Sequence, residues 1–353
     1  MFQRIRDEIG RWFPWSPSLR VVMLGVEYDC AEESAREAFA QDFRSRLQLT
    51  YRRGFSTQLK VPGNKEIDSD AGWGCMLRVI QMILAQSFIN FTLGREWRFE
   101  ESRDLVDGSL WLQIVSCFLD TPEAPFSLHK LVETGESSQG KEPSSWFGPT
   151  SSAKALGNLF KALAKDEGSS PPFLARFGCV VFDDGAIFKA SVLERFSSGC
   201  EAVLLLICRR LGLDSFNESV YRSGIQACFE LPEFLGLASG NNGSSAHYFV
   251  ATHDDDNLLY LDPHTVQPAL EKIEDAQGTL EAGLHAPQAH PLRWARLNPS
   301  ICFGFLVRSP EDFLALCGKL SDERRGEVFE VLEKEPVYTD FSAEEDGDMV
   351  VFG

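Results

Sequence analysis

Two short segments of this 353-residue chain contain the residue types needed for nucleophilic chemistry. In the first, Cys75 follows a Gly72-Trp-Gly turn and begins a long apolar run. Such a run predicts a buried helix, and the unpaired N–H groups at a helix start favour a thiolate. The glycines allow a tight turn and let a substrate main chain approach closely, with Gly74 nearest the thiol. We therefore expect Cys75 to be a partly exposed nucleophile whose own N–H faces an oxyanion.

The second segment is Asp262-Pro-His264, at the end of a β-rich run. Residues two apart in an extended segment point to the same side, with Cα atoms about 6.6 Å apart. Pro263 favours the extended conformation for Asp262. Asp262 could therefore accept a hydrogen bond from one ring nitrogen of His264 and leave the other nitrogen for Cys75.

Two other histidines compete as the base. His247 lies on an apolar strand, and we interpret it as a hydrogen-bonded core histidine. His253 borders three aspartates, and we interpret it as part of a solvated turn. Taken alone, a cysteine or an Asp-Pro-His segment is more often structural, so the prediction depends on the two segments occurring together.

Charge and cysteine usage exclude several function classes. The chain has 34 basic and 52 acidic side chains, for a net charge of −18. That balance argues against a nucleic-acid binder and against a polybasic membrane protein. The nine cysteines are widely spaced without a C-x-x-C pair, which disfavours a disulfide scaffold or a structural metal site. The N-terminus lacks an apolar signal region and no apolar run reaches 18 residues, so we expect a reduced cytosolic protein.

Helical patterns come early in the chain and β patterns come late, which predicts an α+β fold. The expected helices cover 75–91, 105–119, 151–165 and 219–229. The expected strands cover 178–182, 201–209, 246–252, 258–262 and 301–307, with surface loops at 133–145 and 236–245. We expect one catalytic domain over 45–320, an N-terminal extension over 1–44 and an acidic tail over 321–353.

At the reactive residues the sequence closely resembles the catalytic segment of autophagins, the autophagy cysteine peptidases that process a ubiquitin-like autophagy modifier. The resemblance rests on Ser69-Asp-Ala-Gly-Trp-Gly-Cys-Met-Leu-Arg and on Tyr260-Leu-Asp-Pro-His-Thr, which are highly specific together. It covers roughly residues 45–310. Further matches follow in chain order: Tyr51-Arg52, Trp146-Phe-Gly-Pro, Arg210-Leu-Gly-Leu, Leu235-Gly-Leu, Ala246-His-Tyr-Phe and Leu297-Asn-Pro-Ser.

The resemblance implies Cys75 as nucleophile, His264 as base and Asp262 as its orienting partner. It adds roles that spacing alone does not give: Tyr51 as oxyanion donor and Trp146 as a lid residue. It also implies a mobile flap over 235–245 and substrate contacts at Gly74 and Arg210. The implied fold is papain-like, with a buried central helix, an antiparallel sheet and a small inserted subdomain. No metal or cofactor is implied.

The implied function is cleavage after the C-terminal glycine of a ubiquitin-like autophagy modifier. The same chemistry would release the modifier from phosphatidylethanolamine at a membrane. A monomer is expected, cytoplasmic and transiently at autophagic membranes, with the modifier and its lipid conjugate as partners and without nucleic acid. Two alternatives remain: a cysteine peptidase of another ubiquitin-like system, and a non-catalytic modifier-binding protein.

The C-terminal region differs from the family pattern. Relatives can carry an aromatic-x-x-aliphatic docking motif in the tail, whereas Met349 stands where an aromatic residue is expected. Phe329-Glu-Val-Leu332 fits that motif by letter, but it lies in a helix-like run. We therefore favour a helix over a docking motif for this segment. The acids after Pro336 would guide a basic surface of the modifier.

Overall fold

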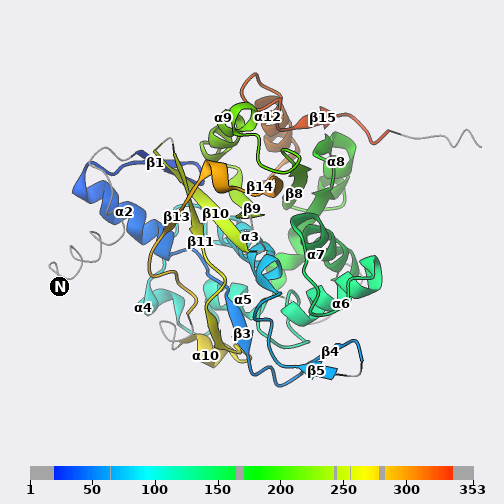
Figure 1. The fold of residues 1–353 in the computed structure, drawn as a ribbon. Helices are drawn as coiled ribbons and strands as arrows, with labels where there is room; N and C mark the ends of the chain where they lie inside the picture. The colour runs from blue at the N-terminus through cyan, green and yellow to red at the C-terminus, as the bar shows by residue number, and fades with distance from the viewer. Residues whose placement is uncertain are drawn as a thin grey trace, which may run out of the picture.

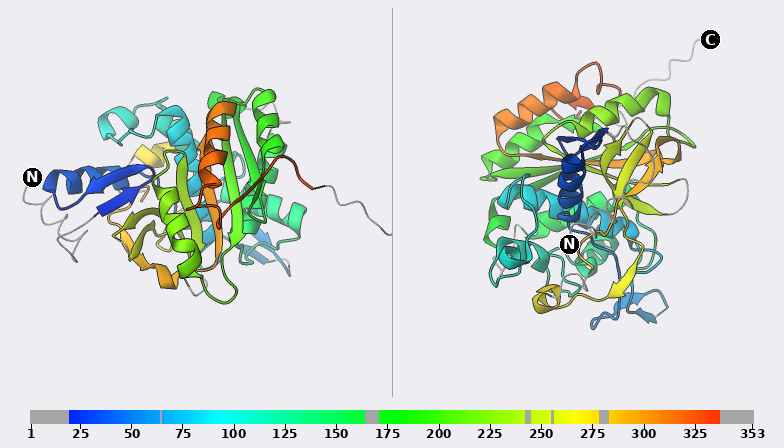
Figure 2. Two further views of the ribbon diagram at one scale, coloured as in Figure 1. Left: turned by 90° about the horizontal axis from the view of Figure 1, so that it is seen from above. Right: turned by 90° about the vertical axis from the view of Figure 1, so that its left-hand side faces the viewer.

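The computed structural model describes residues 20–63, 65–163, 171–241, 245–254, 256–277 and 283–336. A nine-stranded mixed sheet forms its centre, with helices on both faces (Figures 1 and 2). Neighbouring strands are antiparallel except β6 and β8, which run parallel, so the expected antiparallel sheet is mixed at one edge. In spatial order its strands are β13 (His290–Arg293), β11 (Asn257–Leu261), β10 (Ala246–His253), β9 (Phe234–Gly240), β14 (Ser300–Val307), β8 (Ala202–Arg210) and β6 (Phe177–Phe182), with β1 (Arg20–Met23) and β2 (Val26–Asp29) joined to β10.

Three two-stranded sheets and a set of helices complete the described structure. The small sheets pair β3 (Tyr51–Arg53) with β12 (Val266–Pro268), β4 (Leu59–Val61) with β5 (Lys65–Ile67), and β7 (Ala186–Phe188) with β15 (Glu330–Leu332). The helices are α2 (Glu33–Arg44), α3 (Cys75–Thr92), α4 (Glu101–Asp104), α5 (Leu110–Ser116), α6 (Leu128–Gln139), α7 (Pro149–Leu163), α8 (Lys189–Ser197), α9 (Glu218–Phe229), α10 (Ile273–Gln277) and α12 (Pro310–Leu320), with short 3₁₀ turns η1 (Pro172–Arg176) and η2 (Trp294–Arg296).

Helix α3 is the buried helix that the apolar run predicts. It is long and apolar enough to cross a membrane, but 89% of its apolar window is buried inside the fold, so it is a core helix. It packs against β9 and β10. It also approaches β14 closely at Gly304, where an added Cβ would lie 2.7 Å from a methyl group of Ile83.

Two hydrophobic cores lie on opposite faces of the sheet. One surrounds α3 and α7 and includes Phe88 and Leu204. The other lies under α8, α9 and α12 and includes Phe229 and Phe313. Alternate residues of a strand point to opposite faces, so β8, which is apolar and buried from Ala202 to Cys208, contributes to both cores.

The predicted loop at 133–145 is wrong for its first half, which belongs to α6. The hydroxyl of Ser127 accepts a hydrogen bond from the N–H of Lys130 at the start of this helix, and Gly140 ends it with φ = 64°. Gly135 lies against the ring of Phe147, where a Cβ would come within 2.5 Å of a ring carbon. Gly135 is therefore needed for close packing against Phe147 and does not mark a loop.

The predicted loop and flap over 235–245 are wrong for residues 235–240, because these form β9. All seven residues of β9 are buried between β10 and β14. Residues 242–244 lie outside the described residues. Gly236 and Gly240 of β9 are required by close backbone contacts, because a Cβ at either would lie 2.4 Å from the carbonyl oxygen of Phe249 or Ser245. Such a composition imitates that of a loop.

Two further helix predictions need correction. The helix predicted over 105–119 is confirmed only as the shorter α5, which begins after Ser109, whose hydroxyl accepts a hydrogen bond from the N–H of Leu112 at 3.1 Å. The second is the run around Phe329, where residues 330–332 form β15 in parallel pairing with β7. Phe329 is 3% exposed and packs on Phe303 and Phe305, so this segment is not a free docking motif.

The described parts of the expected N-terminal extension and of the expected C-terminal tail pack against the catalytic domain. β1 pairs with β10 in the main sheet, and Phe39 and Phe43 of α2 are fully buried. At the other end, Val328 is buried in the second core. Residues 20–44 and 321–336 are therefore part of the packed domain.

Candidate active site

The sheet and α3 bring the four predicted reactive residues together. Cys75 is the first residue of α3, and Tyr51 begins β3. His264 lies on the short connection between β11 and β12. Because β12 pairs in parallel with β3, this connection lies beside Tyr51, and the Tyr51 N–H donates to the carbonyl of Pro263 at 2.8 Å.

The side chain of Asp262 orients His264. Its Oδ1 lies 2.5 Å from Nδ1 of His264 and also accepts the backbone N–H of His264 at 3.0 Å. The amide of Gln48 donates to the carbonyl of Asp262 at 2.7 Å and fixes the segment. The i, i+2 geometry expected from the sequence is therefore present, and it leaves Nε2 of His264 without a nitrogen or oxygen partner among the described residues.

The thiol of Cys75 is surrounded by groups that stabilise its ionised form. Burial alone raises its pKa, but hydrogen bonds with His264, Tyr51 and the backbone N–H of Ala246 outweigh burial and hold the pKa below its ordinary value. Cys75 is only 1% exposed, so the expectation of partial exposure is wrong. The groups that stabilise the thiolate also cover it.

His264 and Asp262 complete an ion pair with this thiol. Burial disfavours the charged imidazole, yet hydrogen bonds to Asp262 and Cys75 raise its pKa to about 9. Burial also acts against ionisation of Asp262, but its bonds to His264 keep its pKa below the ordinary value. At neutral pH the arrangement favours a thiolate beside an imidazolium.

Tyr51 places its hydroxyl at the reacting sulfur. The hydroxyl hydrogen-bonds to Cys75, and burial is the main cause of its raised pKa, so it remains a proton donor at neutral pH. Its ring meets that of His264 edge to face, with centroids 5.5 Å apart. A neutral hydroxyl beside the thiol is suited to stabilising an oxyanion.

His247 is buried, as a core histidine should be, but it also forms a wall of the site. Its ring stacks on Tyr260 at 4.2 Å and meets His264 edge to face at 5.2 Å. Burial lowers its pKa to about 4, so it is neutral at pH 7. The interpretation of His253 as solvated is wrong, because this residue is buried at the end of β10.

His247, Asp262 and His264 also approach the spacing of a metal site. One ligand atom from each lies within 4.8 Å of the others. However, Oδ1 of Asp262 and Nδ1 of His264 are already joined by their mutual hydrogen bond. The geometry thus suits acid–base chemistry better than cation binding.

A buried ion network under the site was missed in the sequence. Arg78, one turn along α3 from Cys75, lies 2.7 Å from Asp70 and 2.8 Å from Asp120. Asp70 also accepts the backbone N–H of Arg52 at 2.6 Å, next to Tyr51. The network therefore ties β3 to the start of α3. An arginine inside an otherwise uncharged helix was the available signal, because buried charges need partners.

The two glycines of the turn have distinct structural reasons. Gly72 has φ = 88°, a left-handed conformation that favours glycine. At Gly74, a Cβ would come within 2.7 Å of the Asp70 side chain. Gly74 thus leaves room for Asp70, while the predicted substrate contact at Gly74 stays a prediction.

Trp146 and Arg210 lie on surface segments. Trp146, in the loop between α6 and α7, is 45% exposed, and its carbonyl accepts from Nζ of Lys141 at 3.4 Å. Arg210, at the end of β8, is also exposed and donates to Oγ of Ser300 at 3.0 Å and to the carbonyl of Leu213. Their predicted substrate contacts remain predictions.

Comparison with known proteins supports a thiol-peptidase site. Residues 36–319 match the peptidase C54 catalytic domain. The chain is 30% identical over 348 residues to a "Probable cysteine protease atg4" of Sclerotinia sclerotiorum, covering 91% of this chain and 76% of the relative. Proteins of the same printed name from Aspergillus niger and Pichia angusta are 32% and 31% identical, covering 86% and 91% of this chain and 78% and 68% of the relatives.

Proposed function

Because this chain belongs to the peptidase C54 family of cysteine peptidases, we propose that it cleaves after the C-terminal glycine of a ubiquitin-like autophagy modifier. The family has a papain-like fold, and here the buried helix α3 presents Cys75 beside the sheet. The proposal includes two substrates: a modifier precursor with a C-terminal extension, and the modifier joined to phosphatidylethanolamine.

In the first step, the Cys75 thiolate attacks the carbonyl carbon of the terminal glycine. The electron pair of the carbonyl moves to oxygen, where the Tyr51 hydroxyl and the Cys75 N–H stabilise the negative charge. The imidazolium of His264 then gives its proton to the leaving nitrogen, and the C–N bond breaks. A thioester between Cys75 and the modifier remains, and a free amine departs.

In the second step, water cleaves the thioester. His264, now neutral, accepts a proton from water as the oxygen attacks the thioester carbon. Collapse of the second oxyanion restores the thiolate–imidazolium pair and releases the glycine carboxylic acid, which loses its proton to the solvent. Both proposed substrates need only this sequence, because in each the leaving group is an amine on the same glycine.

One observation carries the proposal: the thiol of Cys75 meets three stabilising groups at once, which come from His264, Tyr51 and the backbone of Ala246. Burial without such groups would suppress the thiolate. A glycine at the scissile bond also fits this thiol, because Cys75 is buried and a main chain without a side chain could reach it most easily.

The test is a cleavage assay on an autophagy modifier with a C-terminal extension. The unaltered chain should remove the extension, and Cys75→Ser should remove none above background. Undiminished cleavage by this variant would overturn the proposal. A parallel panel of other ubiquitin-like modifiers with C-terminal reporters tests the alternative that the chain is a peptidase of another ubiquitin-like system. Tight binding without turnover would favour a non-catalytic binder.

We place this activity in the cytoplasm, with transient action at autophagic membranes. All nine cysteines are free thiols in the structure, which suits a reducing compartment. Fractionation of cells with induced autophagy tests this placement. Release of the protein only with a secretory fraction would contradict it.

A further inference from the structure

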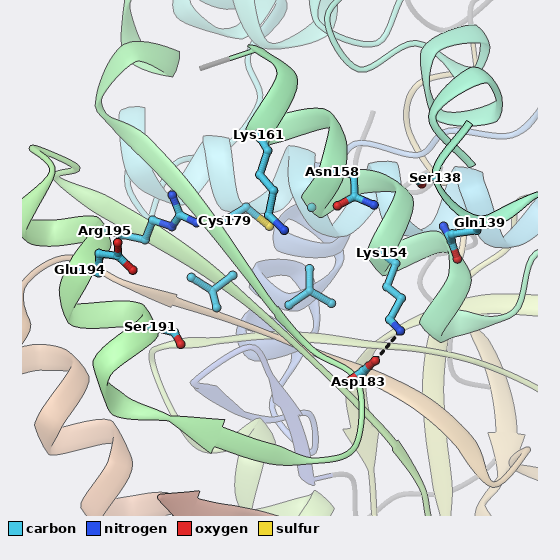
Figure 3. Close-up of a pocket in the computed structure, with 13 residues that line it drawn as sticks. Ser138, Gln139, Lys154, Asn158, Lys161, Cys179, Asp183, Ser191, Glu194 and Arg195 are labelled. Carbon is cyan, nitrogen blue, oxygen red and sulfur yellow. Dashed lines mark ion pairs between the residues drawn. The ribbon is translucent and has the colours of Figure 1, made fainter. Parts of the chain in front are cut away.

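A groove lies along the outer edge of the main sheet, away from Cys75. β6 is the last strand in the sheet order and pairs only with β8 among the described residues. A cavity of about 710 Å³ follows this edge, with α7 on one side and α8 on the other (Figure 3). In a parallel strand alternate residues direct their N–H and C=O groups to opposite neighbours. About half of the backbone groups of β6 therefore face this groove.

The groove has an apolar floor, and its polar walls carry more basic than acidic side chains. Its floor includes Cys179 and Val180 of β6, which are buried. Lys161 of α7 and Arg195 of α8 approach Cys179 from the two sides, as Figure 3 shows, and each acts on the pKa of its thiol. Lys154 is already paired with Asp183.

Two of the three basic side chains that line the groove have no acidic partner among the described residues. Neither Lys161 nor Arg195 forms an ion pair with another described residue, although Glu194 also lines the groove. The Nε of Arg195 is buried and has no hydrogen-bond partner. A buried donor without a partner is costly, and an added acceptor would satisfy it. In a chain of net charge −18, this groove is therefore suited to an extended acidic peptide.

We propose that the acidic C-terminal segment 337–353 docks in this groove as an added strand on the free edge of β6. The segment contains no basic residue, and its acids are Asp340, Glu344, Glu345, Asp346 and Asp348. Its end, Met349-Val-Val-Phe352, has the β-branched and aromatic composition of a strand. Backbone bonds to β6 and charge pairing with Lys161 and Arg195 would hold it.

The described chain ends close to this groove. The carbonyl of Glu333 accepts the N–H of Ala190 at 3.0 Å, and its carboxylate lies 2.6 Å from Nζ of Lys189. Both contacts are at the start of α8, and Arg195 is only about 9 Å further along that helix. The 17 residues that follow Pro336 can span about 55 Å, so the connection is easily long enough.

Hydrogen exchange of the β6 amides in the full chain tests the proposal. Amides bonded to β8 exchange slowly in either case, whereas the outward amides are protected only when a strand covers them. We expect slow exchange throughout 177–182. A variant with all five tail acids changed to Asn or Gln should exchange about tenfold faster at the outward amides. Equal exchange in the two proteins would overturn the proposal.

Charge reversal makes the test independent of folding defects. Lys161→Glu with Arg195→Glu should also speed exchange, and adding Asp346→Lys and Asp348→Lys should restore protection. Lys60→Glu is the matched control, because Lys60 is exposed on β4, far from α8 (Figure 1). Failure of the restoration would contradict charge pairing in this groove.

Hydrogen exchange measured at several protein concentrations distinguishes the chain's own tail from other occupants of the groove. Docking within one chain predicts protection that is independent of protein concentration. Protection lost on dilution would assign the groove to a second copy and overturn the proposal. Protection that appears only after addition of an autophagy modifier would do the same, in favour of that partner.

Discussion

Cys75 and Cys302 are two buried thiols in opposite electrostatic surroundings. Both side chains are at most 1% exposed. In β14, hydrogen bonding with the facing Cys208, together with burial, raises the pKa of Cys302 far above its ordinary value. At Cys75, burial acts in the same direction, but His264, Tyr51 and the Ala246 amide reverse the result. Burial is thus common to both thiols, and the surrounding donors favour the thiolate at only one of them.

The largest effect on activity is expected when the Cys75 thiol is removed, and the matching change at Cys302 tests the comparison. Cys75→Ala should lower kcat/KM for modifier cleavage by at least about 10⁵-fold, because no nucleophile remains. Cys302→Ala should leave kcat/KM within about threefold and lower the free energy of unfolding by about 1 kcal/mol, since packing and a weak thiol hydrogen bond are lost. Steady-state cleavage and urea unfolding measure the two. Comparable losses of activity in both variants would remove the distinction.

The second-largest effect is expected from Asp262, whose carboxylate stabilises the charged form of His264. Asp262→Asn should lower kcat by about 10³- to 10⁴-fold, because the amide no longer favours the required ring tautomer and charge. His264 has its pKa raised to about 9, so activity should fall as the pH rises through that value and the ring loses its proton. Removing the carboxylate lowers the imidazolium pKa.

The pH profile separates this role from a structural one. The alkaline limb should move to lower pH in Asp262→Asn, and a measured profile of residual kcat checks the shift. An alkaline limb at the same pH in both proteins would show that Asp262 does not sustain the charge of His264.

The ion network under Cys75 has no counterpart recorded at Cys302 among the described residues. Asp120→Ala leaves Arg78 with one partner fewer inside the core. We expect a loss of about 3 kcal/mol in the free energy of unfolding, measured by urea titration. The exposed pair Arg176–Glu201 is the control, and Glu201→Gln should cost less than about 1 kcal/mol. Similar costs for both variants would contradict the network's role.

The smallest effect on activity is expected when the Tyr51 hydroxyl, one of the hydrogen-bond donors to the sulfur of Cys75, is removed. Tyr51→Phe keeps the ring packing on His264 and removes the hydroxyl. We expect kcat to fall about 10²-fold with KM little changed, because an oxyanion contact acts mainly in the transition state. A rise in KM at constant kcat would instead identify Tyr51 as a substrate-binding residue.

The sequence predicts the elements whose pattern is local. The apolar run from Cys75 gives α3, shorter apolar runs give β8 and β14, and the Asp262–His264 spacing gives the hydrogen bond found in the structure. These depend on neighbouring residues, so a single chain segment carries the information.

Elements set by tertiary contacts are not predictable in this way. Gly236 and Gly240 of β9 resemble a loop until the neighbouring backbone of Phe249 and Ser245 is placed against them, and Gly135 resembles a helix break until Phe147 is placed beside it. The ion network joins Asp70, Arg78 and Asp120 from separate segments. Only the folded chain reveals that these partners meet.

The most direct test of the account is the covalent capture of Cys75. A ubiquitin-like autophagy modifier with an electrophilic group in place of its terminal carboxyl is incubated with the full chain, and the modified residue is located by mass spectrometry. We predict one adduct, on Cys75, that is lost in His264→Ala and unchanged in Cys302→Ala. Absence of an adduct, or an adduct on another cysteine, would contradict the account.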